Sequence, residues 1–278
     1  MTNKERRIAA VIGNPIAHSM SPLIHNAGIK KLELNYDYLA FKVENVKESI
    51  IKLKKENFVG YSVTIPHKIE VMKYLDEIDP NAKKIGAVNT IVNKNGKLIG
   101  YNTDCDGAIN PLKEITKLNG KNIYLIGAGG AARAIVCGLT QERANVTIFN
   151  RTIEHAQKLA KEFNCKAKEL TEFDSNCEII INTTPVGMWP NINEMPIDAT
   201  VLKKEMIVFD TVYNPLETKL IKSAKNKGCT TILGVEMFLN QAYAQFELFF
   251  HASPPKEHMR EVLLNELKKR QKEQNTKN

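Results

Sequence analysis

The sequence predicts an α/β fold with two domains, each built on a largely parallel sheet. The first observation is that apolar runs of strand length alternate with helix-like patterns along the chain, as in β-α-β units. The second is the length of 278 residues, which fits about two domains. The third is a glycine-rich turn at 127–130, between a buried-strand pattern and an alanine-rich helix. A disordered chain, a collagen-like repeat and a simple coiled coil are excluded, because 43% of the residues are hydrophobic and 25% are charged.

Nine segments have the apolar composition and length of strands. In chain order they are Arg7–Ile12, Tyr36–Lys42, Gly60–Ile65, Thr90–Asn93, Asn122–Ile126, Asn145–Phe149, Ile179–Asn182, Met206–Asp210 and Thr230–Leu233. Other segments have helical patterns: Pro22–Leu32, Val46–Glu56, Lys68–Glu77, Asn110–Lys117, Ala131–Gln141, Ile153–Phe163, Pro215–Lys227, Met237–Phe250 and Glu257–Lys272. A domain boundary is expected near Asn102–Gly107, because the glycine-rich unit begins only after it.

The net charge of +8 does not indicate a nucleic-acid-binding protein. The first ten residues carry a net +2 and residues 256–278 a net +3, so the two ends hold 5 of the 8 excess charges. The remaining chain has no basic run interleaved with aromatic residues, whereas nucleic-acid binding needs a concentrated basic patch. A mild positive bias fits a small anionic ligand.

The cysteine pattern and the lack of long apolar segments predict a cytoplasmic protein. No two of the five cysteines form a C-x-x-C pair, so neither a disulfide framework nor a zinc cluster is expected, and reduced thiols are. The histidines form no ligand-spaced cluster, and no metal is expected. The apolar run Ile8–Ile12 is too short for a signal peptide, and no segment approaches the ~20 apolar residues that cross a bilayer. We expect a monomer or homodimer with a small-molecule substrate, and no nucleic-acid or membrane partner.

The glycine-rich turn predicts a dinucleotide-binding site. The strand pattern Asn122–Ile126 leads directly into Gly127-Ala-Gly129-Gly-Ala-Ala132 and then into a helix, which is the G-x-G-x-x-A arrangement in its strand–turn–helix context. Gly127 permits the tight turn, Gly129 lets the backbone approach a pyrophosphate, and Ala132 keeps the helix close to the sheet. The helix N-terminus offers N–H groups to the anion. The alternative is a glycine-rich turn with a structural role only.

The end of the next strand favours NADP over NAD. A NAD site usually has Asp or Glu there to bind the ribose 2′-hydroxyl, whereas this chain has Asn150-Arg151-Thr152. Arg151 offers a planar guanidinium to a 2′-phosphate, and Thr152 offers a hydroxyl. The alternative is that Arg151 is a solvated surface residue.

Three polar clusters in the first half are candidate binding motifs, although each has an ordinary structural explanation. In residues 18–22, HSMSP, Ser21 is a natural N-cap before Pro22, while Ser19 adds a hydroxyl that can hold a carboxylate. Residues 62–68, SVTIPHK, place Lys68 in the first turn of a predicted helix, where a cation is disfavoured, although most lysines simply face solvent. The third cluster combines Asn89-Thr90 with GYNTDCDG at 100–107, whose Asn, Asp and Gly residues are typical of turns.

Taken in order, these motifs resemble those of shikimate dehydrogenases. The series is GNPIAHSMSP, YSVTIPHK, GAVNT, GYNTDCDG, IGAGGAAR, NRT, NTTPVGM, DTVYNP and GVEMFLNQA, from Gly13 to Ala242. The resemblance implies an N-terminal α/β substrate domain (residues 1–104 with 238–278), a Rossmann-fold NADP-binding domain (105–237), and an active site in the cleft between them. It implies NADPH-dependent, reversible reduction of 3-dehydroshikimate to shikimate, in the pathway to chorismate and the aromatic amino acids.

The resemblance also implies a role for individual residues. Lys68 is similar to the catalytic lysine, the candidate general acid, and Asp104 to its catalytic partner. The implied substrate-binding residues are Ser19, Ser21, Thr64, Lys68, Asn89, Asp104, Tyr213 and Gln241. The implied cofactor-binding residues are Gly127, Ala128, Gly129, Gly130, Ala131, Asn150, Arg151, Thr152 and Gly234.

Three positions depart from the family pattern, and two alternative functions stay open. Ser62 stands where Asn is common, Glu236 interrupts a motif that usually has the form G-x-G-M, and His155 stands where a second basic residue often follows N-R-T. A quinate/shikimate dehydrogenase using NAD shares most of the motifs, but the Arg151-Thr152 pair argues against NAD. A non-catalytic relative that senses the ligand would be supported by loss of the catalytic lysine or aspartate, and both are present.

Overall fold

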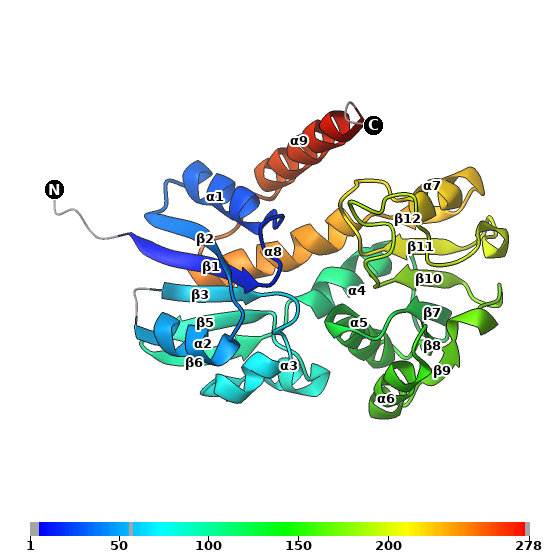
Figure 1. Cartoon of the computed structure of the whole chain (residues 1–278), viewed down its shortest axis with the longest axis horizontal. Coiled ribbons are helices and arrows are strands. Elements are labelled where there is room, and N and C mark those ends of the chain that lie inside the picture. Colours follow the sequence, from blue (N-terminus) through cyan, green and yellow to red (C-terminus); the bar gives the residue numbers. More distant parts are fainter. Residues whose placement is uncertain (1–5, 56–57, 276–278) are drawn as a thin grey trace. The chain divides into compact units, whose positions relative to one another are not determined.

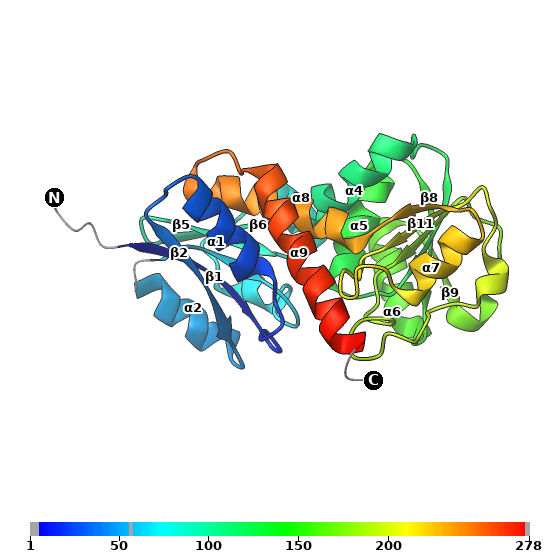
Figure 2. The ribbon, with the colours of Figure 1, turned by 90° about the horizontal axis from the view of Figure 1, so that it is seen from above.

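The computed structural model describes residues 6–55 and 58–275, which form an α/β structure with two sheets flanked by helices (Figures 1 and 2). These residues divide into two compact units. The first unit comprises Met1–Thr103 and Gln241–Glu266, and the second comprises Asp104–Asn240 and Leu267–Asn278. The predicted α/β fold class is confirmed.

The first unit contains a mixed sheet with the strand order β2-β1-β3-β5-β6-β4. Its strands are β1 (Arg7–Gly13), β2 (Tyr36–Lys42), β3 (Phe58–Val63), β4 (Glu77–Ile78), β5 (Thr90–Lys94) and β6 (Lys97–Tyr101). β1 runs parallel to β2 and β3, whereas β5 runs antiparallel to β3 and β6. β4 runs parallel to β6, so three of the five strand pairs are parallel, and the predicted parallel arrangement fails only for the two pairs that involve β5. The reason is the turn Asn95-Gly96, where both residues have positive φ (53° and 89°) and join β5 to β6 as a hairpin.

Helices cover both faces of this sheet. They are α1 (Ser21–Lys31), α2 (Val46–Lys55), the 3₁₀ helix η1 (Glu70–Tyr74), α3 (Pro80–Ile85), and parts of α8 (Gly234–Phe250) and α9 (Lys256–Asn275). α1 and α2 lie on opposite faces (Figure 1). On the α1 face, α8 packs directly on β3, because Gly60 has no side chain: a Cβ there would lie 2.3 Å from a ring carbon of Phe249.

The second unit is a fully parallel sheet with the strand order β12-β11-β10-β7-β8-β9. Its strands are β7 (Asn122–Ile126), β8 (Asn145–Asn150), β9 (Lys166–Glu169), β10 (Ile179–Asn182), β11 (Ile207–Asp210) and β12 (Thr230–Ile232). Its further helices are α4 (Asp104–Ile115), α5 (Gly130–Gln141), α6 (Ile153–Phe163), α7 (Lys219–Asn226) and the 3₁₀ helices η2 (Leu170–Glu172) and η3 (Ala199–Val201). In chain order the sheet is 3-2-1-4-5-6, the order of the Rossmann fold, whose ligands bind at the carboxyl ends of the strands.

Several predicted helix boundaries are wrong because hydrogen bonds from other segments intervene. The segment Lys68–Glu77 is not a helix from its first residue: the Lys68 carbonyl accepts from Val88 N–H (2.8 Å), and only the short η1 follows. Lys68 therefore lies in a turn, and the argument that a helix N-terminus disfavours it does not hold. Ser21 is the first residue of α1 rather than its N-cap, which is Met20.

Other boundaries differ at one end, and the predictions lack three strands, one α-helix and the two 3₁₀ helices η2 and η3 among the described residues. The helix expected from Pro215 begins at Lys219, because the Thr218 hydroxyl caps it by accepting from Ile221 N–H (3.3 Å). The helix expected from Asn110 begins earlier, at Asp104. β4, α3, β6 and β9 were missed. Among the described residues, no helix is long and apolar enough to cross a membrane.

Candidate functional site

The topology of the first sheet brings six of the eight predicted substrate-binding residues to the same side of the sheet, where β1, β3 and β6 end. We call this side, formed by the ends of the strands, the sheet edge. β1, β3 and β6 end at this edge, and the antiparallel β5 begins there. The segments that leave or enter the strands at this edge carry the polar residues. Ser19 and Ser21 follow β1, Thr64 and Lys68 follow β3, Asn89 precedes β5, and Asp104 follows β6.

Backbone hydrogen bonds tie these segments together. Thr64 N–H donates to the Ile12 carbonyl (2.9 Å), which joins the ends of β1 and β3. The Lys68 carbonyl accepts from the residue before Asn89 (2.8 Å), and the Asn89 carbonyl accepts from Val63 N–H (2.7 Å). Thr64, Lys68 and Asn89 are therefore neighbours. The first two are half-buried and the third is buried.

The side chain of Asn89 is oriented by its neighbours. Its Oδ1 accepts from Thr103 N–H (2.8 Å) and from Thr90 Oγ1 (2.7 Å), while its Nδ2 donates to Thr103 Oγ1 (3.0 Å). Asp104 follows directly as the first residue of α4, and it is buried. The chain thus leaves the first unit beside Asn89, with Asp104 as its next residue.

The two serines stand at the start of α1. Ser21 is buried and Ser19 is half-buried, and Ser19 Oγ accepts from Ser21 N–H (3.3 Å). The N-cap residue of this helix is Met20, and its side chain makes no capping hydrogen bond. Two hydroxyls beside such a helix terminus form an arrangement that can bind a carboxylate.

Sequence analysis missed a buried polar cluster between the sheet and α8. Tyr38 Oη donates to Ser62 Oγ (2.6 Å), and Ser62 Oγ donates to Gln245 Oε1 (2.7 Å). His25 stacks on the Tyr38 ring, with centroids 4.2 Å apart. Burial lowers the pKa of His25 to about 3 and raises the pKa of Tyr38, so both side chains are neutral at pH 7. The only sequence signal was the serine at 62. Gln241, which was predicted, lies one turn before Gln245 on α8 and is buried.

In the second unit, the turn after β7 has the geometry of a pyrophosphate site. Gly127 has φ of +111°, and a Cβ there would lie 2.5 Å from Thr183 Oγ1. A Cβ at Gly129 would meet nothing within 4 Å, so the space beside this residue is open. Gly129 is the N-cap of α5 and offers no capping side chain, which leaves the first N–H groups of the helix available to an anion. The intervening and following residues Ala128, Gly130 and Ala131 are half-buried.

The segment after β8 lies beside this turn. β7 and β8 are parallel neighbours with Ile126 opposite Phe149, so residues 150–152 emerge at the same edge. Arg151 and Thr152 are exposed, and Asn150 Nδ2 donates to the Thr152 carbonyl (2.8 Å). No carboxylate stands at 150–152 to repel a 2′-phosphate. These residues fit NADP.

The segment that carries Tyr213 packs against the first turns of α8. The Tyr213 ring stacks on Phe238, with centroids 4.5 Å apart and planes 26° apart. A Cβ at Gly234 would lie 2.3 Å from the Val212 carbonyl oxygen, so only glycine permits this approach. Glu236, which departs from the family pattern, is half-buried in the first turn of the helix.

The buried carboxylate of Asp210, at the end of β11, was also not predicted from the sequence. Asp210 ends β11 and accepts from Thr218 Oγ1 (2.6 Å), Asn182 Nδ2 (2.9 Å) and Val212 N–H (3.0 Å). Burial raises the pKa of Asp210 to about 6, and these three hydrogen bonds oppose the rise. Asp210 ties the end of β10 to the segment after β11.

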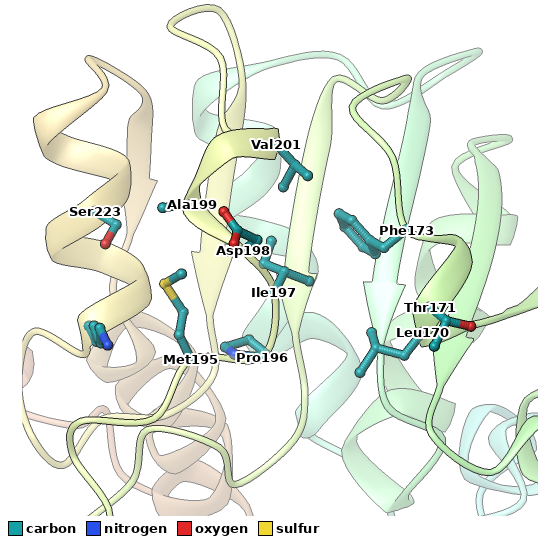
Figure 3. A pocket seen from close by; sticks show the side chains of 11 residues that line it. Leu170, Thr171, Phe173, Met195, Pro196, Ile197, Asp198, Ala199, Val201 and Ser223 are labelled. Carbon is teal, nitrogen blue, oxygen red and sulfur yellow. The ribbon is translucent and has the colours of Figure 1, made fainter.

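A separate hollow of about 720 Å³ lies in the second unit (Figure 3). Ser223 of α7 stands on one side, Leu170 and Phe173 stand on the other, and the segment from Met195 to Val201 lies between them. None of the predicted site residues lines it. The hollow occurs where an irregular segment, rather than a helix, covers this face of the sheet. In the described residues no group of three His, Cys, Asp or Glu side chains could hold a metal ion.

Comparisons with known proteins agree with this geometry. Family models match at residues 11–91 (shikimate dehydrogenase substrate binding domain), 111–212 (shikimate / quinate 5-dehydrogenase) and 234–264 (shikimate 5′-dehydrogenase C-terminal domain). A shikimate dehydrogenase (NADP⁺) from Methanocaldococcus jannaschii is 46% identical over 283 residues, covering 97% of this chain and 100% of the relative.

Solved structures are similar over nearly the whole chain. A shikimate dehydrogenase in complex with NADP⁺ has a TM-score of 0.91 and 45% identity, covering 96% of this chain and 98% of that one. A shikimate 5-dehydrogenase from Listeria monocytogenes, in complex with shikimate and NAD, has a TM-score of 0.84 and 36% identity, covering 94% of this chain and 97% of that one.

Proposed function

Because this chain belongs to the shikimate dehydrogenase family and is an NADP-dependent oxidoreductase that reversibly reduces 3-dehydroshikimate to shikimate, we propose that Lys68 and Asp104 carry the proton chemistry of this reaction. The observation that supports the proposal is the convergence at one sheet edge. The turn that holds Lys68 is hydrogen-bonded to the residue before Asn89, and Asn89 is hydrogen-bonded to the residue before Asp104. The segments that carry the lysine and the carboxylate are thus both connected to the strand end at Asn89.

Different parts of the chain bind the substrate and the cofactor. Residues 1–104 with 238–278 bind the substrate, and residues 105–237 bind NADP. The open space beside Gly129 and the uncapped N-terminus of α5 support the pyrophosphate site. Arg151 and Thr152 bind the 2′-phosphate through charge-assisted hydrogen bonds, which are stronger than neutral ones. The remaining cofactor contacts come from Asn150, from the other residues of the turn and from Gly234.

The substrate is held by polar side chains around the same sheet edge. Ser19 and Ser21, at the start of α1, bind the carboxylate of shikimate. Thr64, Asn89 and Gln241 bind the ring hydroxyls, and Tyr213 lies near the reacting carbon. These assignments extend what the family resemblance implies, and the backbone hydrogen bonds that make Thr64, Lys68 and Asn89 neighbours support them.

Bound NADPH supplies the hydride for this reaction. Negative charge then develops on the carbonyl oxygen of 3-dehydroshikimate, and a proton must reach that oxygen. Lys68 donates this proton from its ammonium group, and Asp104 orients the lysine and the forming hydroxyl. In the reverse direction Lys68, in its neutral form, accepts the proton. General acid–base assistance of this kind is typically worth ~10²–10⁴-fold in rate.

Substitution of the pair tests the mechanism. Lys68→Met and Asp104→Asn should each lower kcat by ~10²–10⁴-fold in NADP⁺ reduction with shikimate. The double variant should lose far less than the product of the two single losses, because the two residues act as a unit. The dissociation constant of NADP⁺, measured by titration, should not change.

The matched control is Lys73→Met, because Lys73 is an exposed lysine in the neighbouring η1. This control should keep full activity. A Lys68→Met enzyme that retains most of its kcat would remove the lysine from the chemistry and leave the family assignment intact.

A further inference from the structure

A chain of hydrogen bonds runs through the interior of the first unit. Tyr38 Oη donates to Ser62 Oγ (2.6 Å), and Ser62 Oγ donates to Gln245 Oε1 (2.7 Å). Gln245 Nε2 donates to Thr90 Oγ1 (3.0 Å), and Thr90 Oγ1 donates to Asn89 Oδ1 (2.7 Å). None of these residues is more than 4% exposed. The chain is therefore a continuous buried polar path.

One end of this path is Asn89, which is proposed to bind the substrate, and the other end is the Tyr38 hydroxyl. The sheet supplies Tyr38, Ser62 and Thr90, whereas Gln245 comes from α8 and is 183 positions away from Ser62. Gln245 thus joins Ser62 to Thr90 and, through Thr90, to Asn89.

The order of donors along the path determines how the Gln245 amide lies. Each hydroxyl has one proton to donate. Ser62 receives the Tyr38 proton and gives its own to Gln245 Oε1, so the Nε2 group must face Thr90. Thr90 in turn gives its proton to Asn89 Oδ1. The path therefore holds Oδ1 of Asn89 as an acceptor inside the protein and leaves its NH₂ end as the donor.

A purely structural role does not account for this path. Hydrophobic side chains of similar volume stabilise an interior at least as well as buried polar groups, which must first lose their water. The neighbouring positions on α8 follow that rule, because Phe246 and Phe249 fill the same layer with apolar rings. A buried glutamine at the position next to Phe246 has a use that an apolar residue cannot serve.

We propose that Gln245 is a positioning residue for the substrate: through Ser62 on one side and Thr90 on the other, it holds the Asn89 amide in the orientation that binds a ring hydroxyl of shikimate. This inference rests on the proposed role of Asn89. It also gives Ser62, the residue that departs from the family pattern, a function as the partner of Gln245. The hydroxyl at 62 acts inside the protein.

The test is a double-mutant cycle in steady-state kinetics. Gln245→Leu should raise the KM for shikimate by ~3- to 10-fold, the worth of a typical hydrogen bond, and leave the KM for NADP⁺ unchanged. Asn89→Ala should also raise the KM for shikimate. In the Asn89→Ala background, Gln245→Leu should have no further effect, because it acts through that amide. The control is Phe249→Leu on the same helix, which should lower the Tm without raising either KM.

Two results separate this inference from the function it rests on. If Asn89→Ala leaves the KM for shikimate unchanged, the proposed site is wrong, and the inference falls with it. If Asn89→Ala raises the KM for shikimate, the site stands. The positioning role is then refuted by either of two results: Gln245→Leu raises this KM by the same factor with Asn89 present and in the Asn89→Ala background, or it raises this KM in neither case. Should Gln245→Leu not be folded at the assay temperature, Ser62→Ala replaces it in the cycle, with the same expected outcome.

Discussion

Two glycines of the same turn should fail in different ways when each is replaced by alanine. Gly127 has φ of +111°, a conformation that side chains rarely adopt, and its added Cβ would lie 2.5 Å from Thr183 Oγ1. Gly129 has φ of −85° and ψ of −167°, which alanine adopts without strain, and its Cβ would meet nothing within 4 Å. The first substitution should therefore damage the fold, and the second should damage cofactor binding.

The magnitude for Gly127→Ala follows from two contributions. The left-handed backbone costs ~1–2 kcal/mol for a residue with a Cβ. Thr183 must also move, which breaks its hydrogen bond to the Ile126 carbonyl (2.7 Å) at a net cost of ~0.5–1.5 kcal/mol. The free energy of unfolding should fall by ~1.5–3.5 kcal/mol, which corresponds to a loss of roughly 3–14 °C in Tm.

For Gly129→Ala, the cost to the free protein is small. Alanine is a poorer N-cap than glycine by no more than about 1 kcal/mol. The methyl group would instead occupy the open space where the pyrophosphate approaches. An added methyl in a close contact costs ~1–3 kcal/mol, which is ~5- to 150-fold in the Kd of NADP⁺.

The assay is thermal unfolding by calorimetry, together with NADP⁺ titration, for both variants and the unsubstituted protein. Similar losses of Tm in the two variants, or an unchanged NADP⁺ affinity in Gly129→Ala, would refute the assignment of separate roles to the two glycines.

Two further predictions concern charge. Arg151→Ala should raise the KM for NADP⁺ by ~10- to 150-fold, the worth of a hydrogen bond to a charged group, and leave the KM for NAD⁺ nearly unchanged; equal losses for both cofactors would show that Arg151 does not touch the 2′-phosphate. Burial raises the pKa of Asp210 from 3.8 to about 6, so the folded protein binds this proton more tightly than the unfolded chain does. Its contribution to the free energy of unfolding is therefore complete below pH 4 and is lost as the pH rises through about 6. This loss amounts to ~3 kcal/mol between pH 4 and pH 7, and Asp210→Asn should remove it. Urea unfolding of both proteins at the two pH values measures it. The prediction fails if the difference in unfolding free energy between the variant and the unsubstituted protein is the same at pH 4 and pH 7.

Short-range patterns were enough to predict most of the second unit. Its strands at 122, 145, 179 and 207 lie inside a parallel sheet and are largely buried, so each is a nearly continuous apolar run that can be recognised in isolation. The edge strand β9 has no such run and was not predicted. The glycine-rich turn could be predicted for the same reason, because its backbone requirements lie within a few consecutive residues. The absence of an acidic residue at 150–152 likewise needed no structure.

The first unit shows what such patterns miss. Its sheet is mixed because the hairpin at Asn95-Gly96 reverses the chain. The Asn-Gly pair is a hairpin signal that can be recognised in the sequence, whereas the strand–helix alternation alone predicts parallel strands. The helix expected at Lys68 does not form there, since its first carbonyl is bonded to Val88 N–H, a partner that only the fold brings close. Propensity describes a segment by itself, whereas a hydrogen bond from elsewhere in the chain can override it.

By itself, the sequence determined the α/β class, the glycine-rich turn after β7, the absence of a carboxylate at 150–152, and the polar residues that follow or precede the strands of the first sheet. Only the tertiary structure decided that Ser62 and Gln245, 183 positions apart, share a hydrogen bond, and that Asp210 is buried against Asn182 and Thr218. The physical reason is the range of the forces. Hydrophobic periodicity and backbone sterics act over a few neighbouring residues and leave a mark in the sequence. The partner of a buried polar group depends on which strands and helices the topology places side by side, and no local pattern records that choice.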